Sequence, residues 1–352
     1  MILKKKHFHE VCGALHLHTT YSDGGTDYNE LIRTASDLGL DFIVVTDHMS
    51  LEALNDGYEG FHKNLLVLVG YEHNDSNNLN HYLAIGVDRV FSECSKSRQY
   101  VEAVRSSGGI GFIAHPAEKR HYFGYFPPYP WTSWEVDGYD GIEIWNQMSD
   151  WVEQLKSWLS VIRILYPRRF IGSPPSELLQ RWDRLNKKRF ISGIGGVDAH
   201  SRKIRIGFFG FRIFPIKVEL KGIRTHLYLK KSLNRSAFDS SKQSILYALK
   251  NGNGFISNYR HADARGTLIF IRYSNGVIAC PGFSKNFSLP ATILVEIPNR
   301  GSIRLIRDGE LIAVVSGCHA EFPVHKKGIY RIEVYRKEKA WIYSNPFPLI
   351  AY

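Results

Sequence analysis

The sequence predicts an α/β fold followed by a small all-β, sandwich-like region. Three observations carry this prediction. Up to about residue 200, short apolar runs alternate with amphipathic segments, as strands and helices do in α/β proteins. Most of these apolar runs end in His, Asp or Glu. From about residue 262 the helical pattern stops, and short β-branched runs lie between turn residues.

The first predicted strand covers residues 11–15 and leads into His16 and His18. Alternate side chains of a strand share one face, so these two imidazoles point the same way and can grip one metal ion. Gly24 and Gly25 allow a turn that brings Asp23 back towards the same cavity. Two half-buried histidines and a turn aspartate explain this stretch equally well when it is taken alone.

The next elements follow in order. Asp27 and Glu30 have the spacing of a capping box and predict a helix that ends near Gly39. Further helices are predicted at 98–107, 150–165, 176–187 and 240–250. Further strands are predicted at 41–46, 65–70, 81–86, 109–114, 141–145, 189–196, 208–214 and 226–229.

Ionisable residues gather at the ends of these strands. Buried ionisable groups are costly unless they are paired or bound to a metal, so packing alone does not explain so many of them. In parallel α/β barrels the carboxyl ends of the strands carry the chemistry. The strand-end residues are His48, Glu72, His73, His115, Asn146, Asp198 and His200, and His81 starts its own strand.

The C-terminal region is predicted to be all-β. Arg307-Asp308-Gly309-Glu310 has the composition of a hairpin turn. We therefore expect two domains, residues 1–261 and residues 262–352, the second of immunoglobulin-like size. Its predicted strands cover 266–273, 291–297, 302–306, 311–315 and 330–335.

Composition limits the class of protein. The chain has 352 residues, and its apolar runs are too short to span a bilayer. Four scattered cysteines and the lack of a signal-peptide core predict a soluble, cytoplasmic protein. The net charge of +11 permits an anionic ligand. Nucleic acid is possible but not favoured, because no basic stripe with interleaved aromatics is present. The oligomeric state is left open.

Five motifs follow one another along the chain: His-x-His-x4-Asp, Thr-Asp-His, Gly-x-Glu, Ala-His-Pro and Asp-Ala-His, in this order. Together they resemble the motifs of the PHP (polymerase and histidinol phosphatase) family. The likeness covers roughly residues 10–260 and is greatest to stand-alone metal-dependent phosphoesterases with an extra C-terminal β domain. That group also includes amide and carbamate hydrolases. The resemblance implies a distorted seven-stranded (β/α) barrel with two or three clustered divalent metals at the strand ends.

The resemblance also implies the ligands. The first metal would be held by His16, His18, Glu72 and Asp198. Glu72 would bridge to a second, held also by His81 and His115, and the third would be held by Asp23, His48 and His200. His73 is an alternative to His81, and Glu143 has no firm role in the pattern.

Imidazole with carboxylate suits Zn²⁺, Mn²⁺ or Fe²⁺. A carboxylate bridge holds two ions about 3.5–4 Å apart, and bound water then has a pKa near about 7. We therefore expect a phosphoesterase acting through metal-activated hydroxide, with Glu72, Asp198 and His200 as catalytic residues. The alternatives are an amide, carbamate or ester hydrolase on the same centre and, less favoured, a metal-retaining binding module.

Two basic clusters follow strand ends and predict a phosphate clamp. Lys119, Arg120 and His121 come shortly after His115, and Arg202 and Lys203 come directly after His200. Arginine binds phosphate oxygens bidentately and lysine acts as a point charge. The substrate is therefore predicted to be a small phosphorylated molecule or a nucleotide. Solvent-facing loop charge is the alternative for any one of these residues.

Overall fold

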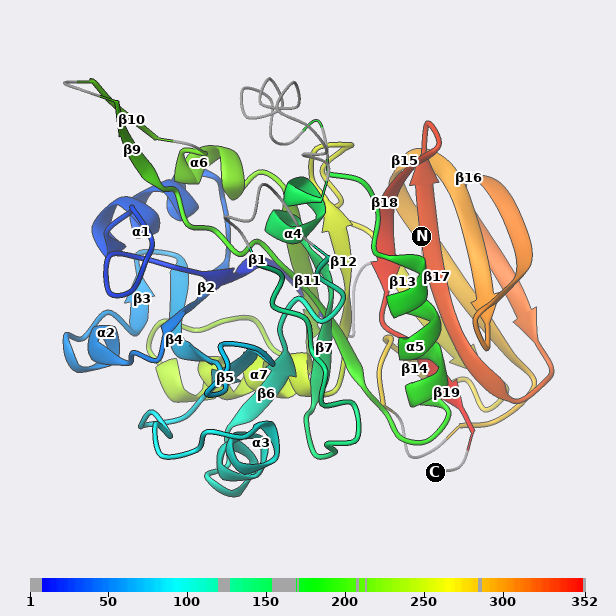
Figure 1. Cartoon of the computed structure of the whole chain (residues 1–352). Helices are drawn as coiled ribbons and strands as arrows, with labels where there is room; N and C mark the ends of the chain where they lie inside the picture. The colour runs from blue at the N-terminus through cyan, green and yellow to red at the C-terminus, as the bar shows by residue number, and fades with distance from the viewer. Residues whose placement is uncertain are drawn as a thin grey trace.

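The computed structural model describes residues 8–119, 127–153, 169, 171–206, 209–212, 214–283 and 287–350. They form a mixed α/β protein with one large sheet (Figure 1). The helices are α1 Tyr28–Asp37, α2 Glu52–Asn55, α3 Ser97–Ser106, α4 Gln147–Val152, α5 Ser176–Asn186, α6 Ile216–Glu219 and α7 Phe238–Lys250. The strands are β1 His9–Leu17, β2 Phe42–His48, β3 Gly60–His62, β4 Leu65–His73, β5 Tyr82–Ile85, β6 Ile110–Ile113, β7 Gly141–Asn146, β8 Ser192–Gly196, β9 Lys203–Ile206, β10 Phe209–Arg212, β11 Ile223–Leu229, β12 Gly254–Asn258, β13 Leu268–Tyr273, β14 Ile278–Ala279, β15 Ala291–Arg307, β16 Glu310–Val324, β17 Gly328–Arg336, β18 Lys339–Ser344 and β19 Phe347–Leu349.

Helix α1 begins where the capping-box spacing predicts. The Asp27 carboxylate accepts a hydrogen bond from the Glu30 N–H at 2.8 Å. The predicted helix 150–165 differs, because α4 already begins at Gln147 and ends at Val152. Residues 154–168 lie outside the described residues. No helix within the described ranges is both long and apolar enough to span a membrane.

The N-terminal strands pair in the order β12-β11-β1-β2-β4-β5-β6-β7-β8. The pairs β1–β2, β2–β4, β6–β7 and β7–β8 are parallel. Strand β5 runs antiparallel to both β4 and β6. Because Tyr82 pairs with His73, the residue before β5 lies at the same edge as the end of β4. This reversal explains why His81 precedes its strand, whereas the other strand-end residues follow theirs.

The end of β8 meets the end of β1. Leu17 and Ala199 form a parallel bridge, and the Asp198 N–H donates to the His16 carbonyl oxygen at 2.7 Å. The two chain segments that carry candidate ligands are therefore tied together by backbone hydrogen bonds. Closure of these strands into a seven-stranded barrel stays a prediction.

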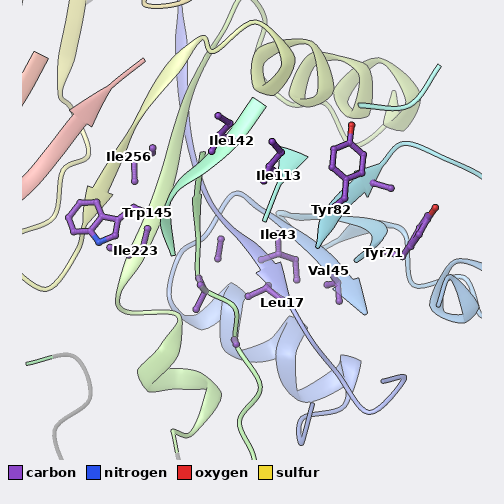
Figure 2. Packing of buried hydrophobic residues seen from close by; sticks show 14 of the residues in the cluster. Leu17, Ile43, Val45, Tyr71, Tyr82, Ile113, Ile142, Trp145, Ile223 and Ile256 are labelled. Carbon is purple, nitrogen blue, oxygen red and sulfur yellow. The ribbon is translucent and has the colours of Figure 1, made fainter. Parts of the chain in front are cut away.

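The central strands are buried on both faces, as parallel strands covered by helices are. Ile43 and Val45 of β2 belong to the largest buried cluster, which also packs on α1 and α3. Their neighbours Phe42 and Val44 belong to a separate cluster that contains the apolar side of α7. Figure 2 shows that the largest cluster extends from Leu17 and Val45 to Trp145 and Ile256.

Beyond residue 262 the described residues form strands and turns, as the sequence predicts. The hairpin turn is confirmed: Arg307 pairs with Glu310, and Asp308 and Gly309 both have positive φ. The predicted strands 291–297 and 302–306 are, however, one strand, β15. Its register shifts between Glu296 and Gly301. The residues before the shift pair with β13, and those after it pair with β17. Strands that change partner at such irregularities make corners in β-sandwiches.

The C-terminal strands continue the large sheet. Strand β18 pairs with β12, and the Asn345 side chain accepts from the Gly193 N–H and donates to the Gly193 carbonyl oxygen at 2.7 and 2.9 Å. In Figure 1 these strands, yellow to red, lie beside α5. The domain boundary at residue 261 and the sandwich arrangement stay predictions.

Candidate metal centre

Histidines and carboxylates from distant parts of the chain meet at one edge of the sheet. They come from the ends of β1, β2, β4 and β8 and from the residues flanking β5 and β6. Four overlapping groups have ligand atoms within 4.8 Å of one another. The groups are His18-Asp23-His48-His200, His16-His18-Glu72, His16-His115-Asp198 and His48-Glu72-His81. Every residue predicted as a metal ligand belongs to at least one group.

Glu72 lies at the middle of the cluster and is only 1% exposed. Its Oε2 atom lies 3.0 Å from His16 Nε2 and 3.2 Å from His18 Nε2. Its Oε1 atom lies 2.8 Å from His81 Nδ1 and 3.0 Å from His115 Nε2. The two oxygens of one carboxylate therefore face two different pairs of histidines. This is the arrangement that a bridging carboxylate requires.

His73, the alternative to His81, points elsewhere. Its Nε2 atom lies 2.7 Å from the Cys94 carbonyl oxygen, and its ring packs on Tyr100. The geometry therefore favours His81 as the partner of Glu72.

Asp198 and Asp23 add two more carboxylates to the cluster; Asp198 is buried, whereas Asp23 lies at the side open to solvent. Asp198 Oδ1 lies 3.5 Å from both His18 Nε2 and His200 Nδ1. Asp23 Oδ1 lies 3.2 Å from His200 Nε2 and 3.8 Å from His48 Nε2. The predicted return of Asp23 through its glycine turn depends on close packing, because a Cβ at Gly24 would lie 2.5 Å from the backbone of His18.

Three of these residues have left-handed backbone conformations. The φ angles are 62° at His16, 25° at His115 and 55° at Asp198. A non-glycine residue in this region costs on the order of 1–3 kcal/mol, and such residues cluster at functional sites. At His16 the register between β1 and β2 also shifts. The two histidines of His-x-His do reach the same carboxylate, but strand alternation alone does not account for it.

Polar residues behind the cluster orient it. Glu143 Oε1 lies 3.0 Å from His16 Nδ1, and Glu143 Oε2 accepts from the His115 N–H at 2.7 Å. Asn146 donates to both Glu143 and Asp198. A histidine that gives one ring N–H to a carboxylate presents its other nitrogen to a metal. Sequence reasoning assigned Glu143 no firm role; the signal that points to it is its place as the one carboxylate in the apolar run of β7.

Asp47, in the Thr-Asp-His motif, is a further residue that sequence reasoning did not select. It accepts from the N–H and the hydroxyl of Thr19, both at 2.7 Å, and from the Ser22 hydroxyl at 2.6 Å. These bonds fix the turn that carries Asp23. The close spacing of Asp47 to His48 is the only sequence signal for this supporting role.

Burial and neighbouring charges move the pKa values of the cluster in opposite directions. Burial lowers the pKa of His18 and His115, but the carboxylates around them outweigh it and raise both to about 9. Burial raises the pKa of Glu72, yet the surrounding histidines hold it well below its usual range. For His48 burial prevails and lowers the pKa to about 4. Protons therefore sit on His18 and His115 at neutral pH, where a metal would displace them.

The donor set fits divalent metals. Around an ion with bonds of about 2.0–2.2 Å, neighbouring ligand atoms lie about 2.8–3.6 Å apart. The contacts of Glu72 and Asp198 with His16, His18, His81 and His115 lie between 2.8 and 3.6 Å. Neither ring nitrogen of the buried His18 has a hydrogen-bond partner among the described residues. A buried polar nitrogen without a hydrogen bond is costly, and coordination of a metal in place of the proton would satisfy one of the two.

The predicted phosphate clamp is placed only in part. Lys119 Nζ lies 3.0 Å from Glu177 Oε2 in an exposed ion pair. Arg120 and His121 lie outside the described residues, and Lys203 is the first residue of β9. Arg202 does reach the cluster, since its Nη2 atom lies 3.0 Å from Asp23 Oδ2. The substrate roles of Lys119, Arg120, His121 and Lys203 stay predictions.

Comparison with protein-family models supports three of the five motifs. The family model of the PHP domain matches residues 14–114, which include His16, His48 and Glu72. The predicted resemblance to that family is therefore confirmed over these residues. His115, Asp198 and His200 lie beyond the matched residues. None of the curated proteins matches the chain.

Several solved structures are similar. A two-domain protein from Bacteroides vulgatus, described as containing a predicted PHP-like metal-dependent phosphoesterase, has 15% identity and a TM-score of 0.49, with 97% of this chain and 96% of that chain covered. A protein from Bifidobacterium adolescentis, provisionally described as a metal-dependent phosphoesterase, has 16% identity and a TM-score of 0.35. The match covers 53% of this chain and 87% of that chain. An amidohydrolase from Chromobacterium violaceum has 14% identity and a TM-score of 0.34, with 58% and 92% covered.

Proposed function

We propose that the protein is a metal-dependent phosphoesterase that hydrolyses a small phosphorylated molecule or nucleotide. The observation that carries the proposal is Glu72, a buried carboxylate whose two oxygens face separate pairs of histidines. A structural ion pair does not need both oxygens divided in this way, whereas a bridge between two metals does.

The ligand sets are those that the family resemblance implies, and the contacts within the cluster support them. His16, His18, Glu72 and Asp198 would hold one ion; Glu72, His81 and His115 a second; and Asp23, His48 and His200 a third. When bound, two such ions supply a nucleophile from water at neutral pH and neutralise charge that develops on a phosphoryl group. Imidazole and carboxylate ligands suit Zn²⁺, Mn²⁺ or Fe²⁺.

Exposure defines the side from which substrate enters. The side chains of Glu72 and His16 are at most 1% exposed, whereas those of His200, His48 and Asp23 are 13%, 29% and 42% exposed. Substrate therefore reaches the centre past these three residues. Arg202 lies beside Asp23 on this side and can bind a phosphate oxygen.

The remaining roles are proposals of the same kind. His200 assists the leaving group, either as a ligand or by holding a proton at Nε2, the ring nitrogen nearest Asp23. Lys119, Arg120, His121 and Lys203 contribute to the phosphate clamp. The strands from β1 to β8 close into a distorted seven-stranded barrel, residues 262–352 form a separate β-sandwich-like domain, and the protein acts in the cytoplasm, where its four free cysteines stay reduced.

The test combines metal analysis with a substrate panel. The purified protein is analysed for bound metals, stripped with a chelator, and reloaded singly with Zn²⁺, Mn²⁺ or Fe²⁺. Each form is assayed on chromogenic phosphate monoesters and diesters, carboxylic esters, amides and carbamates. We expect two or three ions per chain and metal-dependent hydrolysis of phosphate esters. Hydrolysis of amides or carbamates instead would establish the alternative hydrolase, and bound metal without any turnover would establish a binding module.

A further inference from the structure

Strand β16 has one long edge that no other strand covers. Among the described residues it pairs only with β15, from Glu310 to Val324. In Figure 1 it lies, in orange, at the outer margin of the C-terminal strands. It has 15 residues, whereas the edge strands β3, β14 and β19 have only two or three. A free edge is a row of N–H and C=O groups that can pair with another strand, and short edge strands avoid such pairing.

The first half of this edge lacks the usual protection. Between Glu310 and His319 the strand reads Leu-Ile-Ala-Val-Val-Ser-Gly-Cys, with no charged residue and no proline. Natural edge strands are commonly protected by lysine or proline. The one bulged residue of this half is Ile312, because β15 residues 305 and 306 pair with 313 and 311. The residues from Ala313 to Gly317 pair without a break, so their outer side presents a regular row of backbone groups.

Apolar side chains are exposed along the same run. Leu311, Ile312 and Val314 are 53%, 41% and 52% exposed, and they are three of the five exposed large apolar side chains of the described residues. Ala313 and Val315 point to the other face, where they pack against the C-terminal apolar cluster. Single exposed apolar residues are ordinary, whereas three within four residues beside a free edge indicate an interaction surface.

A second copy of β16 fits this edge. In an antiparallel pairing about a twofold axis, each strand meets its own sequence in reverse. With the axis at Val315 and the bulged Ile312 left out, Ala313 lies opposite Gly317 of the second copy. At both ends of the run Glu310 then lies opposite His319 of the second copy, so a carboxylate meets an imidazole. The uncharged residues between these ends meet uncharged residues, and no charge is covered without a partner.

We propose that two copies of this chain pair through β16 as a closed antiparallel dimer. The pairing satisfies free N–H and C=O groups of both strands and covers part of the exposed apolar surface. Because it uses the long free edge of each copy, it stops at two chains and does not continue into a fibre. The inference does not rest on the proposed function, since every candidate metal ligand lies before residue 201.

The first test measures the mass of the purified protein in solution. Sedimentation velocity over a range of micromolar concentrations should show a change from one chain of 40.3 kDa to twice that mass. Val314→Lys places a cation beside the free edge and should raise the dissociation constant of the dimer at least about tenfold. A protein that stays a single chain at every concentration, or that forms open-ended assemblies, overturns the inference.

The matched control for this substitution is Val277→Lys. Val277 is also 52% exposed, but it lies between β13 and β14 and is separated from β16 by β13 and β15. It should leave the dissociation constant unchanged, and an equal effect of both lysines overturns the inference. Circular dichroism checks that each variant is folded. If Val314→Lys does not fold, Ser316→Lys tests the same edge, because Ser316 is also exposed.

The second test locates the twofold axis. In the proposed register residue 315 lies opposite residue 315 of the second copy, with Cα atoms about 4.5–5.5 Å apart, which a disulfide can span. Val315→Cys should therefore give a disulfide-linked dimer on mild oxidation, identified by mass spectrometry of the linked peptides. Ala313→Cys is the control, because it lies on the same face but opposite Gly317. Linkage through residue 313 and not through residue 315 overturns the inference.

The third test is a double-mutant cycle at the ends of the run. Glu310→Ala and His319→Ala should each weaken the dimer about two- to threefold. Because each removes the same contact, the variant with both substitutions should be no weaker than either alone. Effects that multiply in the double variant overturn the proposed register.

Discussion

The molecule contains two clusters of buried charge, and they differ in how completely they are satisfied. At the contact between α5 and β17, the Arg331 guanidinium donates to both Asp183 oxygens, at 2.9 and 3.0 Å, and to Glu333. At the candidate metal centre, Glu72 and Asp198 are equally buried, but His18 beside them has two ring nitrogens without a hydrogen bond.

The difference teaches where to look for a ligand. Both clusters violate the rule that charges stay at the surface, so burial of charge does not distinguish them. The Arg331 cluster is closed, because opposite charges and hydrogen bonds meet within it, and its role is to dock α5 on the C-terminal strands. The Glu72 cluster has donors left over and strained backbone at His16, His115 and Asp198. Unsatisfied buried polar atoms and strained backbone are both typical of a ligand-binding site.

The largest expected effect comes from breaking the Glu72 bridge. Glu72→Gln removes one negative charge and one of the two metal-facing oxygens, so we expect loss of bound metal and at least about a thousandfold loss of turnover. Metal content is measured by elemental analysis and folding by circular dichroism. Glu177→Gln, at an exposed carboxylate paired with Lys119, is the control and should keep both metal and rate. A folded Glu72→Gln protein with full metal content would refute the bridge.

The closed cluster should respond in the opposite way. Arg331→Met leaves the Asp183 and Glu333 carboxylates buried and unpaired, so the free energy of unfolding should fall by about 3–5 kcal/mol. Metal content of the folded protein should not change. Denaturant unfolding and elemental analysis measure the two quantities. Replacing Arg331, Asp183 and Glu333 together by apolar residues should recover much of the stability, and a triple variant as unstable as Arg331→Met would contradict this reading.

The candidate metal centre should also make the stability of the metal-free protein depend on pH. Because the folded-state pKa of His18 and His115 is raised from 6.5 to about 9, their protonation stabilises the metal-free fold below about pH 6.5, and this contribution is lost as pH rises to 9. We expect the chelated protein to lose on the order of 1–3 kcal/mol across this window. The metal-loaded protein should lose less, since metal replaces the protons. Thermal unfolding of both forms over this pH range measures the two losses. If the stability of both forms falls equally with pH, the exchange of protons for metal is refuted.

The smallest effect is expected at the rim of the centre. Arg202 is 54% exposed and pairs with Asp23, so Arg202→Ala should raise KM for a phosphate ester by about tenfold or less and leave kcat nearly unchanged. Lys119→Ala, at a cation already paired with Glu177, should change KM less. Steady-state kinetics on one phosphate ester and one neutral ester checks both. An equal change on the neutral ester would show that Arg202 does not act on phosphate.

Much of the N-terminal fold could be predicted, because its strands are short apolar runs with chemistry at their ends. Strand ends that carry His48, Glu72 and Asp198 are visible in the sequence since local pattern determines them. The role of Glu143 could not be predicted, because it depends on which segments the fold brings together. The reversed direction of β5 was likewise hidden, although it is the reason why His81 reaches Glu72.

The C-terminal region was predicted less well for a related reason. Register and partner choice are long-range properties, and a strand such as β15, which changes partner midway, has the same local pattern as two separate strands.

The ladder between β12 and β18 joins the backbone of the two halves of the molecule, and Asn345 adds two hydrogen bonds to Gly193. Opening either half would leave donors and acceptors of the other exposed at a new strand edge. Amide protons of Phe255 and Ser257 should therefore exchange with solvent at the same slow rate as those of Ile342 and Ser344. The loop between β12 and β13, although it joins two separate apolar clusters, should then resist limited proteolysis until the whole chain unfolds in one cooperative transition.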